Sequence, residues 1–404
     1  MPPASPTELV IENLGGRGDG IATAEGRRIF VPLSTPGDRV LADLDGERAK
    51  VLEIVEASPH RVTPPCAHFA NCGGCALQHI DMAWQLDWKR GLVRDALARV
   101  GIEAKVAPTQ PIPPGRRRRA SFAVQRFGRR VVLGFNERRA HRIVALNECH
   151  VLRPEIVALL PALRAFLAEL KVPKKFDLHV AWLGGLDLWI AADLADDLAT
   201  HERLAAFADD ADLARLSVGT SPEVVVMRRA PAVREGGRGI VPPPGGFLQA
   251  SDEAEAWLAA QVRAAADGAR HVVDLYAGCG VLTAGLASNV DLKLYEGDGA
   301  AVAAARAAGL NATQRDLARR PLQPDELKNI DLVVLDPPRV GAAPQAAALA
   351  ASTVPTIAYV SCHPGSFARD ARALVDGGLR LSRVQPLDQF TWSAHVELAA
   401  VFTR

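Results

Sequence analysis

The stretch "HVVDLYAGCGVLTAGLA", residues 271–287, decides the fold of the last part of the chain. It has the pattern of a buried strand, a glycine turn and a helix. Three further apolar runs follow it, each separated by a possible helix: "LKLYEGD", "IDLVVLDPP" and "TIAYVSC". Alternating strands and helices are typical of a parallel α/β sheet. We therefore expect residues 241–404 to form an α/β domain of the Rossmann-like class.

Acidic residues stand at the ends of these predicted strands. Asp274 and Glu296 end the first two, Asp316 follows in "NATQRDL", and Asp336 lies in "LDPPR". The carboxyl ends of parallel strands share one edge of a sheet, where α/β proteins bind ligands. The G-x-G turn lacks the third glycine of a dinucleotide site, so this set fits S-adenosylmethionine better than NAD. Ordinary helix capping is the alternative role for Glu296 and Asp316.

Cys362 lies in "IAYVSCHPGSFARD", where a predicted strand opens into a Pro-Gly loop. The thiol could fill the core, form a disulfide, bind a metal or act as a nucleophile. Carbon 5 of a pyrimidine becomes nucleophilic when a thiolate adds to carbon 6, and a base must then remove the proton from carbon 5. Glu397 in "HVE" is the candidate base, because an antiparallel last strand would begin beside Cys362. Core filling by Cys362 and a surface position for Glu397 are the alternatives.

The length and composition suggest a multidomain protein outside the membrane. At 404 residues, two or three domains are expected, and the net charge is only +1. No apolar run is long enough to cross a bilayer, and the first residues do not resemble a signal peptide. We therefore expect a cytoplasmic protein, in which structural disulfides are rare.

The first part of the chain has the pattern of a small β-barrel. Short apolar runs within residues 8–56 are separated by "GGRGDG" and "STPGD", which are turn sequences. Four or five such strands suggest an OB-like barrel, a fold that binds oligonucleotides. A purely structural β module is the alternative.

Cys66, Cys72 and Cys75 are closely spaced, and Cys149 lies far along the chain. Three clustered thiols with a remote fourth are typical of a [4Fe–4S] site. Zinc would more often bring a second close pair. The spacing alone leaves the cluster, zinc and unliganded thiols open.

Arginines are concentrated between Thr109 and Arg142, where Glu137 is the only acid. The ten are Arg116, Arg117, Arg118, Arg119, Arg126, Arg129, Arg130, Arg138, Arg139 and Arg142. A basic patch without balancing acids favours contacts with nucleic-acid phosphates. A solvated basic face is the alternative.

Together these motifs resemble the S-adenosylmethionine-dependent RNA uracil-C5 methyltransferases, closest to the branch that modifies large-subunit rRNA. The most specific are "SCHPGSFARD" and "HVE", with support from "GGFLQASDEAEAWL" and "DLYAGCG". The resemblance covers nearly the whole chain. It implies a TRAM RNA-binding domain at 1–58, a central α+β iron–sulfur domain at 59–240 and a class I methyltransferase domain at 241–404. A helix over 81–101 is expected to belong to the central domain or to pack on the catalytic one.

The resemblance also implies residue roles. Cys362 would be the nucleophile and Glu397 the general base. The remaining implied sites are cofactor contacts at Gln249, Tyr276, Glu296, Asp316 and Asp336, substrate contacts at Phe247, Arg116, Arg117, Arg118 and Arg119, and [4Fe–4S] ligands at Cys66, Cys72, Cys75 and Cys149. The implied substrate is 23S rRNA, with tRNA as the alternative, and the implied assembly is a monomer.

The sequence departs from the family pattern at three positions. His363 replaces the usual Asn beside the nucleophile, Val281 stands where an Asn often meets the cofactor, and Ser366 replaces a Thr. Two other functions would explain part of the sequence. One is cytosine-C5 methylation, which also uses a cysteine. The other is a non-catalytic iron–sulfur protein that binds RNA.

Overall fold

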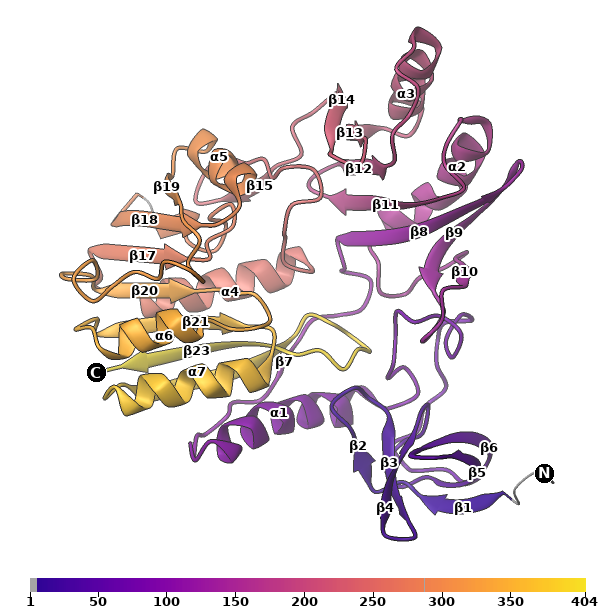
Figure 1. Cartoon of the computed structure of the whole chain (residues 1–404), viewed down its shortest axis with the longest axis horizontal. Coiled ribbons are helices and arrows are strands. Elements are labelled where there is room, and N and C mark those ends of the chain that lie inside the picture. The colour runs from indigo at the N-terminus through magenta and orange to yellow at the C-terminus, as the bar shows by residue number, and fades with distance from the viewer. Residues whose placement is uncertain (1–5, 287) are drawn as a thin grey trace.

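The computed structural model describes residues 6–286 and 288–404, which form three β-sheet units (Figure 1). The first is a six-stranded sheet of order β1-β5-β6-β4-β3-β2, which encloses a small apolar core around Val31 and Val40. Its strands are β1 (Thr7–Val10), β2 (Asn13–Leu14), β3 (Gly20–Ala24), β4 (Arg27–Val31), β5 (Arg39–Asp45) and β6 (Arg48–Glu56).

The central unit is a seven-stranded sheet of order β10-β9-β8-β11-β12-β13-β14. Its elements are β8 (Arg119–Phe127), β9 (Arg130–Asn136), β10 (Ile143–Ala145), α2 (Pro154–Glu169), β11 (Lys175–Trp182), β12 (Leu186–Ala191), α3 (Leu198–Asp210), β13 (Leu213–Val218) and β14 (Glu223–Met227). Helices α2 and α3 cover one face, where Phe122, Leu178 and Leu188 are fully buried. Side chains alternate along a strand, so Ser121 and His179 lie on the opposite, uncovered face. A short hairpin, β15 (Val233–Glu235) and β16 (Arg238–Ile240), leads to the last unit.

The third unit is an eight-stranded sheet of order β19-β18-β17-β20-β21-β23-β22-β7. The first five strands in this order are parallel, and β23 runs antiparallel to β21. Its strands are β7 (Gln110–Pro111), β17 (His271–Leu275), β18 (Asp291–Glu296), β19 (Asn311–Gln314), β20 (Leu332–Leu335), β21 (Thr356–Ser361), β22 (Arg380–Asp388) and β23 (Glu397–Thr403). The expected parallel α/β sheet is therefore confirmed.

Helices cover both faces of this sheet. They are α1 (Met82–Arg99), α4 (Asp252–Ala265), α5 (Gly299–Ala307), α6 (Ala343–Ala350) and α7 (Pro364–Asp376). Helices α1, α6 and α7 pack on the face that carries Leu335 and Tyr359, while α4 and α5 pack on the face that carries Val334 and Ala358. No helix in the described ranges is long and apolar enough to cross a membrane.

One segment differs from the sequence pattern, and another takes one of the two placements that the sequence left open. The helix expected after the glycine turn is only a 3-10 turn, Ala284–Leu286, because β18 already begins at Asp291; Ala287 lies outside the described residues. Helix α1 packs on α7 and β22, and the buried Lys89 Nζ lies 2.5 Å from Asp388 Oδ1 at the end of β22. The segment 82–111 therefore belongs physically to the C-terminal sheet.

Candidate active site

A cavity of about 700 Å³ opens at the edge where the parallel strands end. It brings together most of the residues singled out in the sequence: Phe247, Gln249, Asp274, Tyr276, Glu296, Asp316, Asp336, Cys362 and Glu397. Arg119 of the central sheet also lines it, together with Arg339, Gln389 and Phe390. The wall is thus shared between the central and C-terminal units.

The glycine turn and Glu296 form one end of the cavity. Glu296 Oε2 accepts a hydrogen bond of 2.9 Å from the Gly278 N–H, and Oε1 accepts bonds from Gly297 and Asp298. The turn needs glycine at position 280, where φ is +81° and a Cβ would lie 2.4 Å from Leu294 Cδ2. Three backbone donors therefore hold the Glu296 carboxylate in one orientation at the end of β18.

Buried carboxyl groups cluster behind this turn. Burial raises the pKa of Asp274 and of Asp336 to about 7, and the charges of neighbouring acids add to both shifts. Asp274 accepts a 2.6 Å bond from Thr283 Oγ1, and Asp336 accepts a 3.1 Å bond from Gln249 Nε2. Such a site favours a cationic ligand, because a positive charge would stabilise the ionised acids.

Cys362 and Glu397 meet through strand pairing. Ser361 at the end of β21 pairs with Leu398 in β23, so the residues beside them face the same cavity. Burial and the charges of Glu397 and Asp336 together raise the pKa of the Cys362 thiol to about 11, against the lowering effect of Arg339. Burial also raises the pKa of Glu397, which is 3% exposed, well above its usual range. The expected antiparallel last strand and its position beside Cys362 are therefore confirmed.

His363 caps helix α7. Its Nδ1 accepts a 3.1 Å hydrogen bond from the Ser366 N–H, and burial lowers the pKa of the imidazole. An Asn side chain at an N-cap accepts the same kind of bond. The substitution therefore preserves the capping interaction beside Cys362. Ser366 in turn donates from Oγ to the Arg339 carbonyl, which connects α7 to the Asp336 loop.

One site residue, Gln389, had no motif in the sequence, whereas a second, Arg119, belongs to the arginine run singled out there. Gln389 is buried and lies between Gln249 and Glu397, with its Nε2 2.9 Å and 2.8 Å from their side-chain oxygens. Arg119 stands over the Phe247 ring, with 5.0 Å between the guanidinium carbon and the ring centroid. The position of Gln389, just past the end of β22, is the only signal that would have suggested it.

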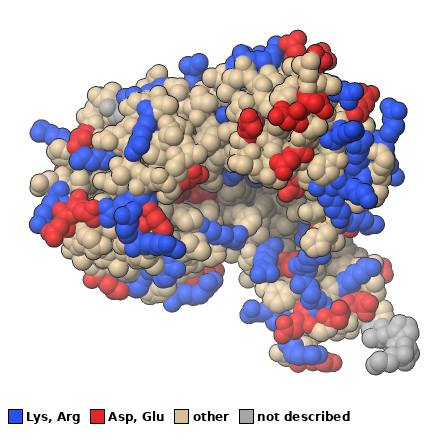
Figure 2. Space-filling view, turned by 45° about the horizontal axis from the view of Figure 1, so that its top comes forward, with Lys and Arg blue, Asp and Glu red and all other residues tan. Residues whose placement is uncertain are grey.

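The arginine run does not form one continuous basic surface. Arg118 is only 1% exposed and forms ion pairs with Asp252 and Glu255 of α4. The expectation that Arg118 contacts RNA is therefore wrong, because its guanidinium is used to join β8 to α4. Arg126 likewise bonds to backbone carbonyls, whereas Arg129 is exposed. Figure 2 shows Lys and Arg side chains gathered on the right-hand side of the molecule.

The four clustered cysteines lie near one another. Burial raises the thiol pKa values of Cys72 and Cys75, and the charges of Cys66 and Cys149 add to both shifts, an effect that requires proximity. The Gly74 N–H donates to Cys72 Sγ at 3.4 Å, and backbone N–H groups also donate to Cys149. Within residues 6–286 and 288–404, no three His, Cys, Asp or Glu side chains are arranged to hold a single metal ion.

Comparisons with known proteins find relatives among RNA methyltransferases. A family model described as tRNA (Uracil-5-)-methyltransferase matches residues 301–404. The chain is 42% identical to an uncharacterized RNA methyltransferase of Caulobacter vibrioides, over 98% of this chain and 100% of that protein. It is 35% identical to the 23S rRNA (uracil(1939)-C(5))-methyltransferase RlmD of Halomonas elongata, over 96% of this chain and 88% of that protein.

One solved structure shares the fold over almost the whole length. It is the tRNA (uracil-54, C5)-methyltransferase of Pyrococcus abyssi in complex with S-adenosyl-L-homocysteine. The TM-score is 0.76 at 24% identity, covering 98% of this chain and 99% of that chain. This similarity shows a common fold.

Proposed function

The chain belongs to the family of S-adenosylmethionine-dependent RNA (uracil-C5) methyltransferases, and we propose that it acts through a covalent bond between Cys362 and carbon 6 of the target uracil. The observation that carries the proposal is the placement of Cys362 and Glu397 at the paired ends of β21 and β23, facing one cavity. A nucleophile and a base are thereby brought to the same substrate ring.

The cavity residues would hold the cofactor by their charges and hydrogen bonds. S-adenosylmethionine supplies a methyl group on a cationic sulfur. Glu296, fixed by three backbone N–H groups, is suited to accept hydrogen bonds from ribose hydroxyls. The acids Asp274 and Asp336 surround the cavity with negative charge once they are ionised. Tyr276 and Gln249 line the same wall.

The proposed reaction uses Cys362 twice, as nucleophile and as leaving group, and Glu397 once, as base. The Cys362 thiolate adds to carbon 6, the C5–C6 π electrons move through carbon 4 onto O4, and carbon 5 becomes enolate-like. Carbon 5 then forms a bond to the methyl group, whose bond to sulfur breaks. Glu397 takes the proton from carbon 5, the C5–C6 double bond returns, and the Cys362 thiolate leaves. A carboxylate with a raised pKa is a stronger base than an exposed one, which suits Glu397 to this step.

The adduct provides the test. Cys362→Ala should neither methylate RNA nor bind it covalently. Glu397→Gln should add to uracil and transfer the methyl group but release RNA slowly, so a protein–RNA adduct should survive denaturing electrophoresis. RNA with 5-fluorouridine at the target should trap the wild-type protein in the same way, because fluorine cannot leave as a cation. Formation of 5-methyluridine by Cys362→Ala would refute the covalent mechanism.

We infer that the substrate is 23S rRNA. The support is the 35% identity to the Halomonas elongata rRNA enzyme over nearly the whole of both proteins. tRNA is the second candidate, because the family model and the solved neighbour are both named for tRNA. The barrel at 1–58 would act as a TRAM domain and contribute RNA affinity. Mapping 5-methyluridine in rRNA and tRNA from cells with and without this protein distinguishes the two.

We also infer a [4Fe–4S] cluster bound by Cys66, Cys72, Cys75 and Cys149. The support is the closely spaced Cys66, Cys72 and Cys75 with the remote Cys149 beside them, and N–H donors to sulfur are typical of such sites. The cluster would fasten the loop at 66–75 to the central sheet. Anaerobically purified protein should contain iron and sulfide; zinc in equal amount to the protein, without iron, would contradict the assignment.

A further inference from the structure

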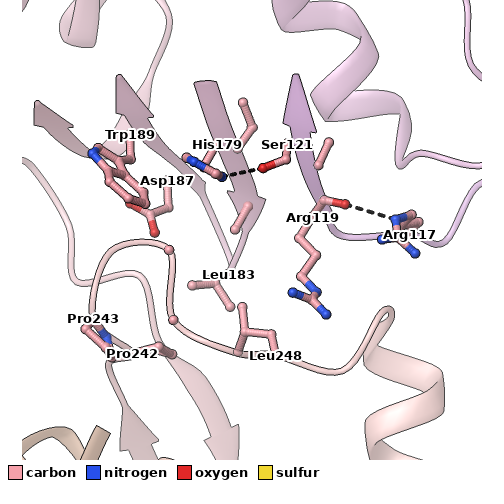
Figure 3. A pocket seen from close by; sticks show the side chains of 15 residues that line it. Arg117, Arg119, Ser121, His179, Leu183, Asp187, Trp189, Pro242, Pro243 and Leu248 are labelled. Carbon is pink, nitrogen blue, oxygen red and sulfur yellow. Dashed lines mark hydrogen bonds between the residues drawn. The ribbon is translucent and has the colours of Figure 1, made fainter. Parts of the chain in front are cut away.

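A second cavity, of about 130 Å³, lies on the uncovered face of the central sheet (Figure 3). Three side chains lie abreast on its floor, because Ser121, His179 and Trp189 are paired across β8, β11 and β12. The next row on the same face contains Arg119, Ala181 and Asp187. The cavity is thus built on three strands, β8, β11 and β12, that pair with one another without a register shift.

The aromatic floor is held rigidly. The His179 and Trp189 rings are stacked, with 4.4 Å between centroids and 21° between planes. Ser121 Oγ is hydrogen-bonded to His179 Nδ1, and Trp189 Nε1 donates to the Gly219 carbonyl at 2.9 Å. Burial lowers the pKa of His179, so the imidazole is neutral at pH 7 and can accept or donate a hydrogen bond.

The opposite wall is the segment that joins the central and C-terminal units. It contributes Pro242, Pro243, Gly245, Gly246 and Leu248. Its backbone approaches the indole so closely that a Cβ at Gly245 would lie 2.6 Å from Trp189 Cζ3, and φ of Gly245 is +71°. An apolar wall therefore faces a rigid aromatic and polar floor, and the gap between them is far smaller than the 700 Å³ cavity.

Arg119 connects the two cavities, since its side chain lines both. Its Nε is buried without a hydrogen-bond partner, and no acid in the described part of the chain forms an ion pair with it. Burial and the nearby Arg117 and Arg118 lower its pKa to about 10, so the side chain is still charged at pH 7. An uncompensated guanidinium between two cavities is suited to a phosphate. Beside it, Phe247 is 63% exposed.

We propose that the second cavity binds the base of a nucleotide close to the target uridine in the RNA, while Arg119 holds a phosphate between the two bases. The inference rests on the proposed RNA methyltransferase function. Single-stranded RNA is recognised by unstacked bases that pack on aromatic side chains and by hydrogen bonds to their edges. Pro243 and Leu248 supply an apolar wall here, the Trp189 ring supplies a stacking surface on the floor, and His179 supplies a polar group for the base edge.

The test is a binding cycle with RNA heptamers, AAAUAAA and variants in which one nucleotide beside the uridine is abasic. Affinity is measured by fluorescence anisotropy with S-adenosyl-L-homocysteine present. The wild-type protein should lose about 10-fold in affinity when one particular flanking base is removed. Trp189→Ala should lose about 10-fold on the intact heptamer and should not respond to that abasic position, whereas Trp189→Phe should recover most of the affinity.

Trp182→Ala is the matched control, because Trp182 lies three residues after His179 on β11 and so on the opposite face. Trp182→Ala should bind the intact heptamer and the abasic heptamer with the same affinities as the wild type. Thermal unfolding of each variant detects a folding defect. The proposal is overturned if Trp189→Ala keeps wild-type affinity, or if it responds to every abasic position as the wild type does. It is also overturned if wild type responds at no position. Absence of 5-methyluridine formation by the wild type would instead refute the proposed function.

Discussion

Gln389 Nε2 donates a 2.8 Å hydrogen bond to Glu397 Oε2 inside the buried end of the cavity. The orientation of this amide is fixed, because Gln389 Oε1 accepts a bond from the Ala250 N–H at 2.8 Å. The same Nε2 also donates to Gln249, whose own amide donates to Asp336. Two amides therefore connect the carboxyl groups of Glu397 and Asp336 in one chain of hydrogen bonds.

Replacing Gln389 by Leu should impair proton removal more than methyl transfer. The bond from Gln389 lowers the pKa of Glu397, so its loss should raise that pKa and shift the activity profile to higher pH. We expect kcat to fall by about 10-fold or more at pH 7.5, with some covalent adduct accumulating. Transfer of a tritiated methyl group to RNA, measured across a pH series, gives kcat and its pH profile. Gln385→Leu, on the strand β22 that leads to Gln389, is the control, and equal pH profiles for the two variants would contradict the prediction.

Arg339 should control the reactivity of Cys362. Its guanidinium lowers the pKa of a thiol that burial raises to about 11, so Arg339→Gln should raise this pKa and reduce the thiolate fraction at pH 8. Alkylation of Cys362 by iodoacetamide, followed by mass spectrometry of the peptide, should be slower in the variant and should increase with pH in both proteins. Arg383→Gln on β22 is the control. A faster reaction in Arg339→Gln would show that the charge has no such effect.

Cofactor binding should release protons. Asp274 and Asp336 have pKa values of about 7, so both are partly protonated at neutral pH. A cationic ligand lowers carboxyl pKa values, and affinity for S-adenosylmethionine should therefore rise from pH 6 to pH 8 and then level off. Calorimetry in buffers of different ionisation enthalpy measures the released protons. Asp336→Asn should reduce their number, and an affinity independent of pH would refute this account.

Replacing Arg118 should affect stability and replacing Arg129 should affect RNA binding, although both residues belong to the same arginine run. Arg118→Ala leaves Glu255 buried without its partner, which costs about 3–5 kcal/mol of stability. Arg129 is exposed, so Arg129→Ala should leave the unfolding midpoint unchanged, weaken RNA binding and reduce its salt dependence. Thermal unfolding and binding at several salt concentrations separate the two effects. Wild-type stability in Arg118→Ala would show that the ion pair contributes nothing.

Serine substitutions of Cys149 and Cys279 form a matched pair that tests whether Cys149 binds the proposed cluster. Cys149→Ser should lower the iron content and the unfolding midpoint, because a bound cluster stabilises the segment that it cross-links. Cys279→Ser, in the glycine turn after β17, should retain iron. Affinity for S-adenosylmethionine should stay near the wild-type value in Cys149→Ser. Equal iron content in the two variants would exclude Cys149 as a ligand.

Local patterns predicted the C-terminal sheet and its ligand edge well. Apolar runs that end in Asp274, Glu296 and Asp336 fix both the strand and the side of the sheet where the acid lies. Local patterns did not predict which side chains would be buried or which residues far apart in the sequence would be in contact. The count of arginines gave no sign that Arg118 would be covered by α4, and Gln389 belongs to no motif. Its role depends on β22 lying beside β23, which follows from packing rather than from local sequence.

The position of α1 and β7 makes the C-terminal unit discontinuous along the chain. Lys89 and Asp388, which form the buried ion pair between α1 and β22, are 299 residues apart in sequence. During synthesis, the surface of α7 and β22 on which α1 packs therefore does not exist until almost the entire polypeptide has been made. A fragment that starts at residue 241 would expose the surfaces of α7 and β22 that α1 normally covers, so we expect such a fragment to aggregate. The central sheet is in effect an insertion, held at both ends, within a unit that closes only when the last strands have been made.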